Sequence, residues 1–223
     1  MNLPVCASLV AFTLALGACA SAPVHYYTLV SPATDSAVAR QPAPFAIDVL
    51  PVGIPALLDQ QPLVLRQGDS DVAVLDNERW AAPLGDEVRT ALSAELVHRL
   101  GVQDVTGLAR PAGKSVLTVK LQVRRLDAWP GHGVQLEADW SLGFAGNADT
   151  AHLTCHSRLQ EATSGGYADL VRAQQRVVVR LADQIASNAR GWAMSQTQGC
   201  TPAAGLAPSD ARSPQPLTEA PHA

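Results

Sequence analysis

Three residues with metal-binding or nucleophilic side chains lie close together in the segment HLTCH, namely His152, Cys155 and His156. On a helix the three would share one face and could bind zinc, and a cysteine beside a histidine could act as a thiol nucleophile. The surrounding residues alternate between apolar and polar, which is the period of a β-strand. In a strand the two histidines point to one side and Cys155 to the other. The pattern therefore favours neither a metal site nor a thiol active site.

No other segment has the pattern of an active site. The chain lacks the G-x-S-x-G, P-loop and G-x-G-x-x-G motifs of common hydrolases and nucleotide-binding proteins. The segment GDSD (68–71) has two carboxylates beside a serine, but turns are often built from such residues. We therefore expect a non-enzymatic protein with no catalytic residues, no cofactor and no metal.

A different thiol chemistry is indicated at Cys19, which ends the segment LGAC (16–19). Residues 5–16 are a run of about a dozen apolar or small residues, too short for a membrane span of roughly 20 but typical of a secretory signal. An apolar residue, two small residues and a cysteine form a lipobox, whose thiol receives a diacylglycerol before cleavage. The sequence thus predicts a signal peptide over 1–18 and a lipidated Cys19; an ordinary signal with a chance cysteine is the alternative.

This segment resembles the signal of bacterial lipoproteins, which carry two or three acyl chains, palmitate among them. One chain holds a protein only marginally, whereas several anchor it lastingly. The residue after Cys19 is Ala20, and not the Asp that marks retention at the inner membrane in that class. The resemblance therefore implies a lipid anchor at the periplasmic face of the outer membrane of a Gram-negative cell.

The composition fits one folded domain between two tails. Hydrophobic residues make up 47% of the chain and charged residues 16%, with a net charge of −4 and no basic block, which argues against a nucleic-acid partner. We expect a lipidated N-terminus and tether over 19–44, in which 31–44 is small, polar and proline-bearing. The domain is expected over 45–200, followed by a disordered, proline-rich tail over 201–223.

Cys155 and Cys200 form a second pair of interest. Once Cys6 leaves with the signal and Cys19 is lipidated, they are the two cysteines left in an oxidising compartment. A disulfide between them would close a loop of about 46 residues and stabilise the fold by about 4 kcal/mol in the chain-entropy model. Two independent buried thiols are the alternative.

The spacing of hydrophobic residues predicts the strands and helices that position these residues. Alternating residues predict about six strands, at 45–51, 62–66, 72–76, 115–123, 133–144 and 151–160. Turns at 130–133 and 146–149 separate the last three, which should form an antiparallel meander with one solvent-facing side. Two long amphipathic helices are predicted, at 83–100 and at about 167–192. A mixed, largely antiparallel sheet covered by these helices predicts a single α/β domain.

Trp80 lies where a predicted strand meets the first helix. It could seal the end of the helix as a core residue, or it could be an exposed anchor for a partner protein. Tyr26 and Tyr27, in the segment YYTL, are amphipathic residues that could serve as further anchors. These three aromatic residues are the candidate partner-binding residues.

Four stretches in this order resemble a known family. They are the lipobox, YYTL (26–29), the long stretch that runs from IDVLPVGIP (47–55) to SAEL (93–96), and GGYADLVRAQQRVVVRLADQIA (165–186). Together they resemble the ABC-type transport auxiliary lipoproteins, and within them the PqiC-type subunits of membrane-integrity transporters. The resemblance spans roughly residues 19–192.

The resemblance implies a non-enzymatic lipoprotein at the outer membrane. Such proteins are the distal component of a transporter whose MCE-domain proteins bridge the periplasm and move lipids or other hydrophobic molecules between the two membranes. An MCE-domain protein is therefore the expected partner, and a homo-oligomer is left open. Two alternatives are a lipoprotein chaperone for outer-membrane assembly and a periplasmic thiol enzyme, which would need a free, reactive Cys155.

Overall fold

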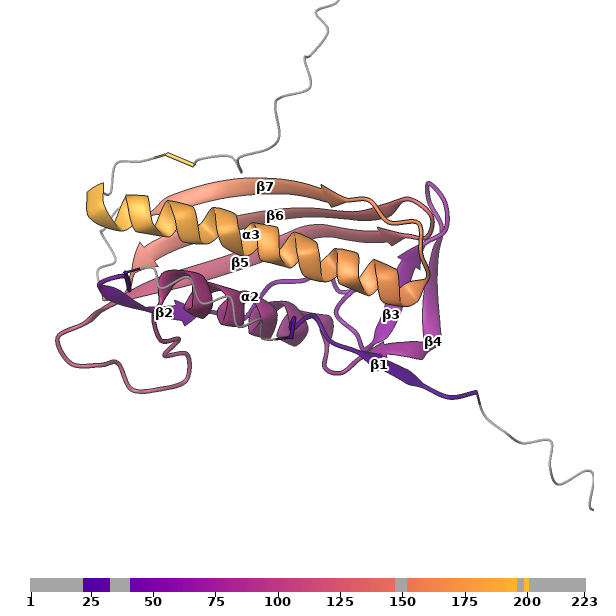
Figure 1. The fold of residues 1–223 in the computed structure, drawn as a ribbon, viewed down its shortest axis with the longest axis horizontal. Coiled ribbons are helices and arrows are strands. Elements are labelled where there is room, and N and C mark those ends of the chain that lie inside the picture. The colour runs from indigo at the N-terminus through magenta and orange to yellow at the C-terminus, as the bar shows by residue number, and fades with distance from the viewer. Residues whose placement is uncertain (1–21, 33–40, 147–151, 196–198, 201–223) are drawn as a thin grey trace, which may run out of the picture.

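Two sheets and two helices make up the part of the chain that the computed structural model describes, residues 22–32, 41–146, 152–195 and 199–200 (Figure 1). Cys19, the predicted signal peptide and the predicted tail over 201–223 lie outside these residues. The strands are β1 (His25–Tyr27), β2 (Phe45–Val49), β3 (Pro62–Arg66), β4 (Val72–Trp80), β5 (Ser115–Trp129), β6 (Gly133–Phe144) and β7 (Leu153–Glu161). The helices are α2 (Leu84–Leu100) and α3 (Tyr167–Ser195).

The larger sheet has the strand order β2-β5-β6-β7. Strands β5, β6 and β7 are antiparallel neighbours, which confirms the predicted meander, and β2 is added parallel to β5. Leu121, Trp140 and Cys155 are register partners across the three strands and point to the same side. Each strand alternates buried and exposed residues along most of its length, so its buried residues point to one side of the sheet. These buried residues are mostly apolar, and that side of the sheet is therefore apolar.

The two helices lie side by side on the apolar side of the larger sheet (Figure 1). Their leucines and valines interdigitate with those of the strands in one continuous core. Helix α2 ends at Gly101, whose backbone has φ of 65° and donates its N–H to the carbonyl of Val97 at 2.9 Å. A glycine suits this left-handed position because it has no Cβ to clash. Both predicted helices and the α/β class are therefore confirmed.

The prediction of one sheet of about six strands needs correction. The described residues form seven strands in two sheets, because β3 and β4 pair with each other and β1 pairs with β4, in the order β1-β4-β3. No backbone pairing joins β3 to β5 in the described part of the chain; the two strands meet through side chains, among them Arg66 and Asp127, 3.2 Å apart. Alternation reveals that a strand exists but carries no information about which strand edge it will pair with.

Two parts of the segment 19–44, predicted as the lipidated N-terminus and tether, are described by the structure and contact the domain. Leu29 is buried, and Glu87, itself only 5% exposed, accepts hydrogen bonds of 2.8 Å from the Leu29 N–H and from the Thr28 hydroxyl. Further along, the Ala43 N–H donates to the Leu100 carbonyl at 2.9 Å. Leu29 and Ala43 thus pack in the core, and β1 pairs with β4.

The Asp104 carboxylate joins the middle of α2 to the loop after the helix and to Val49 of β2. Asp104 accepts hydrogen bonds from the Ser93 hydroxyl and from both the N–H and the hydroxyl of Thr106, at 2.9 and 2.7 Å. Partial burial is the largest influence and acts to raise the pKa of Asp104, but the hydrogen bonds from Ser93 and Thr106 outweigh it and lower the pKa below its usual value. The charged form is therefore favoured in the folded state.

Replacing Asp104 with asparagine should reduce the free energy of unfolding by about 1–3 kcal/mol at neutral pH, because hydrogen bonds to a charged group are lost or weakened. The pKa of Asp104 is lower in the folded state than its unfolded value of about 3.9, so ionised Asp104 stabilises the fold at any pH above that unfolded value. This stabilisation is lost as the pH falls through the folded-state pKa. Urea unfolding should give different free energies of unfolding for the wild type and Asp104→Asn at neutral pH, and similar values in acid. The exposed Asp76→Asn is the control, and an equal loss there would contradict the assignment.

Candidate functional site

The three candidate aromatic residues lie in different environments. Tyr26 is 64% exposed, whereas Tyr27 is partly buried and its hydroxyl donates to the Glu78 carboxylate at 2.6 Å. Burial, and then this hydrogen bond to Glu78, raise the pKa of Tyr27 to about 12. Tyr27 is therefore a structural residue of β1, and Tyr26 has the exposure that a binding residue needs.

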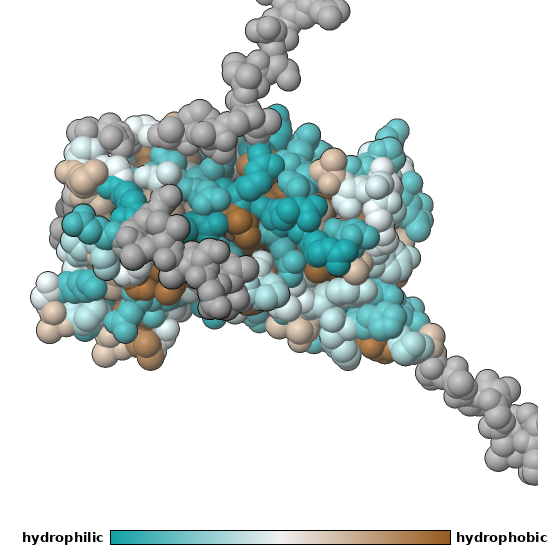
Figure 2. Space-filling model, in the orientation of Figure 1, coloured by the Kyte–Doolittle hydropathy of each residue, from teal (hydrophilic) through white to brown (hydrophobic). Residues whose placement is uncertain are grey.

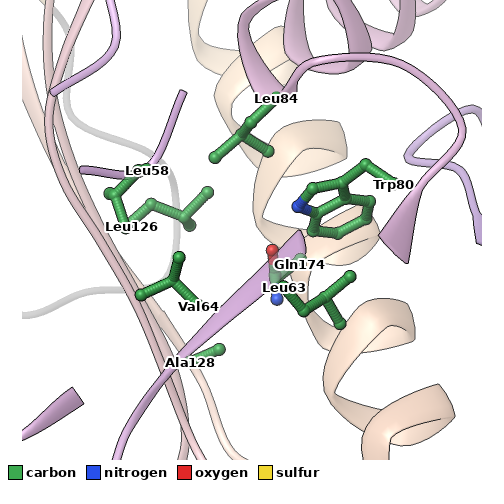
Figure 3. A pocket seen from close by; sticks show the side chains of 8 residues that line it. All are labelled: Leu58, Leu63, Val64, Trp80, Leu84, Leu126, Ala128 and Gln174. Atoms are coloured by element: carbon green, nitrogen blue, oxygen red, sulfur yellow. The ribbon is translucent and has the colours of Figure 1, made fainter. Parts of the chain in front are cut away.

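Trp80 lies in the core, with 3% of its surface exposed. Figure 3 shows its indole beside Leu63 and Leu84, with the side chain of Gln174 below it. The gap among these side chains is only about 10 Å³, room for about one water molecule and no larger ligand. This burial favours the core alternative for Trp80 over the partner-binding one.

The HLTCH segment adopts the predicted strand alternation. Cys155 is buried in β7, and His156 faces solvent on the other side, with its ring nitrogen 2.8 Å from Asp139. Within the described residues, no three metal-ligating side chains are grouped as a metal site requires. The segment positions a buried sulfur and an exposed histidine, and it does not bring them to one reactive centre.

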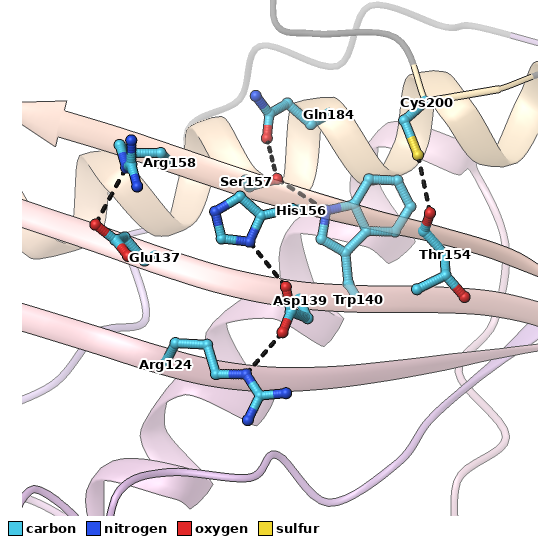
Figure 4. Close-up of polar contacts among 10 residues, drawn as sticks. All are labelled: Arg124, Glu137, Asp139, Trp140, Thr154, His156, Ser157, Arg158, Gln184 and Cys200. Atoms are coloured by element: carbon cyan, nitrogen blue, oxygen red, sulfur yellow. Dashed lines mark hydrogen bonds and ion pairs between the residues drawn. The ribbon is translucent and has the colours of Figure 1, made fainter.

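Cys200 lies against Cys155, with their Cα atoms 5.7 Å apart and their sulfur atoms joined. This separation lies in the usual range for a disulfide. The Cys200 sulfur also lies 3.1 Å from the Thr154 carbonyl, drawn in Figure 4. A disulfide sulfur has no proton to donate, so we interpret this as a packing contact. The pairing links the chain beyond α3 to strand β7.

We predict that Cys155 and Cys200 form a disulfide in the exported protein. Peptide mapping without reductant should yield one linked pair, and mild reduction should lower the melting temperature because the unfolded chain regains freedom. A Cys155→Ser, Cys200→Ser double variant should melt at the same temperature with and without reductant. Two free thiols in the mature protein would refute the pairing.

Polar contacts lie on both sides of the larger sheet (Figure 4). On the helix side, the Trp140 indole N–H donates to the Ser157 hydroxyl at 2.8 Å, and that hydroxyl donates to Gln184 of α3 at 2.7 Å. These two hydrogen bonds satisfy buried polar groups and hold α3 against the sheet. It is therefore a structural network.

The opposite side of the larger sheet carries rows of paired charges. Asp139 lies between Arg124, at 2.7 Å, and His156, and Glu137 pairs with Arg158 at 3.1 Å. The hydrogen bond from His156, followed by that from Arg124, lowers the pKa of Asp139 below its usual value. These charges face opposite ones, so this side is polar without being strongly cationic or anionic.

An open groove of about 850 Å³ lies beside this polar side, where β5, β6 and β7 approach the β3–β4 hairpin. We call it the Trp129 groove. Its defining side chains are Trp129, His132, the arginines Arg66, Arg125, Arg158 and Arg180, and the acids Asp69, Asp127 and Glu161. The groove is thus lined by four cationic and three acidic side chains, with an indole among them.

Ion pairs hold the arginines of the groove in place. Asp127 lies 3.2 Å from Arg66 and 3.7 Å from Arg125, and Glu161 lies 3.5 Å from Arg180. The buried Arg66 Nε forms an ion pair with Asp127 without a hydrogen bond, and Nη2 of the same guanidinium donates to the Asp127 carboxylate at 3.5 Å. The Trp129 ring lies over His132, with centroids 4.3 Å apart.

Tryptophan and arginine are the residue types that most often dominate protein–protein binding, so this arrangement can bind a protein surface with both charges. Sequence analysis did not single out Trp129. A tryptophan directly before the turn PGHG was the available signal, since turn-flanking side chains often remain reachable from solvent. None of the described helices combines the length and apolar character needed to cross a bilayer.

Comparisons with known proteins identify the relatives of this chain. Residues 27–186 match the family model described as the ABC-type transport auxiliary lipoprotein component. The crystal structure of an uncharacterized protein is 20% identical, with a TM-score of 0.56 over 75% of this chain and 99% of that one. A DUF330-family protein from Xanthomonas campestris is 14% identical, with a TM-score of 0.55 over 78% and 99%. At these identities the structures show a shared fold. Curated protein sequences gave no match.

Proposed function

The chain belongs to the ABC-type transport auxiliary lipoprotein family, and on this basis we propose that it is the lipid-anchored, non-enzymatic subunit of a transporter in the cell envelope. The observation that carries the proposal is the family match, which runs from β1 through most of α3 and so includes nearly the whole described body. In this proposal Cys19 carries the lipid, and the body stands at the periplasmic face of the outer membrane. The cargo is a lipid or another hydrophobic molecule.

We further propose that the partner is an MCE-domain protein of the PqiC-associated kind, and that it docks at the Trp129 groove. The groove offers an indole that is partly exposed, and arginines that are already oriented by Asp127 and Glu161. Side chains held in place before binding lose less freedom on binding, which favours affinity. Tyr26, in contrast, lies on β1, outside the groove lining.

A role as a thiol enzyme has little support from the geometry. Cys155 is buried on the side of the sheet that the helices cover, and its sulfur is joined to that of Cys200. A nucleophilic thiol needs to be ionised and reachable by a substrate. We therefore assign these cysteines to stability.

Affinity capture of the wild-type protein from gently solubilised envelopes tests the proposed function. Mass spectrometry should identify an MCE-domain protein, and a permease or ATPase of the same transporter, among the specifically recovered proteins. The Cys19→Ala variant captured in parallel controls for proteins that are recovered only because they share the membrane. Recovery of a β-barrel assembly protein without any transporter component would contradict the proposal and favour the chaperone alternative.

A further inference from the structure

An exposed apolar patch lies where the described chain begins. Val24 is 42% exposed and Tyr26 is 64% exposed, and Tyr26 is the register partner of Arg79 on β4. We call Val24, Tyr26 and Arg79 the β1 patch. In Figure 2 a small hydrophobic area is visible at the corner of the body from which the N-terminal trace leaves. The tyrosine and the arginine beside it, with an exposed valine two residues before the tyrosine, form an amphipathic surface.

The other side of β1 fixes this patch to the body. His25 and Tyr27, whose side chains point away from Tyr26, both contact Glu78, at 3.1 and 2.6 Å. The Tyr27 carbonyl accepts the Ala81 N–H at 2.8 Å, and Leu29 is held by Glu87. Because β1 is bound at several points, the exposure of Tyr26 is a constant feature of the folded body.

The chain length places the patch close to Cys19. Val24 and Tyr26 follow Cys19 by five and seven residues. Even a fully extended chain of these lengths reaches only about 18 and 25 Å. A lipid on Cys19 would therefore keep the β1 end of the body near the bilayer surface, whereas the loop before β5 and the end of α3 lie at the other end of the long axis (Figure 1).

We infer that the β1 patch rests on phospholipid headgroups and orients the body on the membrane. A tyrosine ring is favoured at the headgroup level, a valine can reach the acyl boundary, and a guanidinium can bind phosphate. The Arg79 Nε donates to the Asp76 carbonyl at 2.7 Å, and among the described residues no carboxylate lies within ion-pair distance of it. Its charge is therefore available to a phosphate. This inference rests on the proposed lipidation of Cys19.

Hydroxyl-radical footprinting tests the contact. The acylated wild-type protein is bound to vesicles of phosphatidylethanolamine and phosphatidylglycerol, and the Cys19→Ala protein is labelled in solution. Tyr26 should be oxidised several-fold more slowly on the vesicles. Met194, which is 83% exposed in the last turn of α3, should be oxidised equally in both samples. Arg79→Glu should restore Tyr26 oxidation on vesicles, and Arg110→Glu, in the loop before β5, should not.

Vesicle sedimentation separates the failure of this inference from the failure of the anchor. If the acylated protein sediments and Tyr26 is oxidised as fast as in solution, the β1 patch does not contact the membrane and the inference is overturned. If the wild-type protein does not sediment at all, the proposed lipid anchor fails, and the inference fails with it.

Discussion

Replacing Trp80 with alanine is expected to lower the free energy of unfolding by about 3–5 kcal/mol, as for other buried tryptophans. The indole fills the space between β3, the start of α2 and α3, and the cavity that remains beside it in the native protein is only about 10 Å³. Truncation would leave a void that these elements cannot close without breaking their own contacts. Chemical denaturation of the wild-type and variant proteins measures the loss.

Trp129→Ala is the matched control for this experiment. Trp129 is partly exposed in the groove, so its removal should cost clearly less stability than the removal of Trp80. If Trp80→Ala leaves the unfolding midpoint unchanged, Trp80 is not a core residue and the packing described for β3, α2 and α3 is wrong.

Cys19→Ala should release the protein from the membrane altogether. Acyl chains supply about 0.8 kcal/mol of binding for each buried CH₂ group, and the described helices offer no membrane span in their place. Fractionation should find that the variant is lost from the outer-membrane fraction.

The Cys6→Ala variant controls for the loss of a cysteine near the N-terminus. Cys6 lies within the predicted signal peptide, so this variant should still be lipidated and should remain with the outer membrane. Metabolic labelling with a palmitate analogue should mark the wild-type and Cys6→Ala proteins and leave Cys19→Ala unmarked. Equal membrane retention of the wild-type and Cys19→Ala proteins would refute lipid anchoring at this residue.

The helices and the meander could be predicted because their periods are local properties of the sequence. Val88, Leu92 and Leu96 recur at the spacing of one helix face, so neighbouring residues alone were enough to predict this helix. The turns around Gly133 and Gly146 separate the last three strands and so predicted their order. The continuation of β5 beyond Val123 was missed because a β-bulge between Val123 and Arg125 shifts the alternation.

The features that define the groove and the β1 patch depend on contacts between distant residues. Arg66 and Asp127 are 61 positions apart, and Glu87 holds Leu29 across 58 positions. The helix dipole alone explains an acidic residue in the first turn of a helix, so nothing in the sequence distinguished the buried Glu87 from the exposed Asp86. For Trp80 the residue pattern left both a buried and an exposed position open, and only the structure decides between them.

Direct binding of the purified protein to the MCE-domain component of its transporter tests the central claim most closely. We predict a saturable complex, which Trp129→Ala weakens by about 2 kcal/mol or more, roughly 30-fold in Kd. The control Lys120→Ala changes an exposed residue of β5 outside the groove lining and should bind like the wild type. If the wild-type protein binds no MCE-domain component, its assignment as the docking subunit of such a transporter is contradicted.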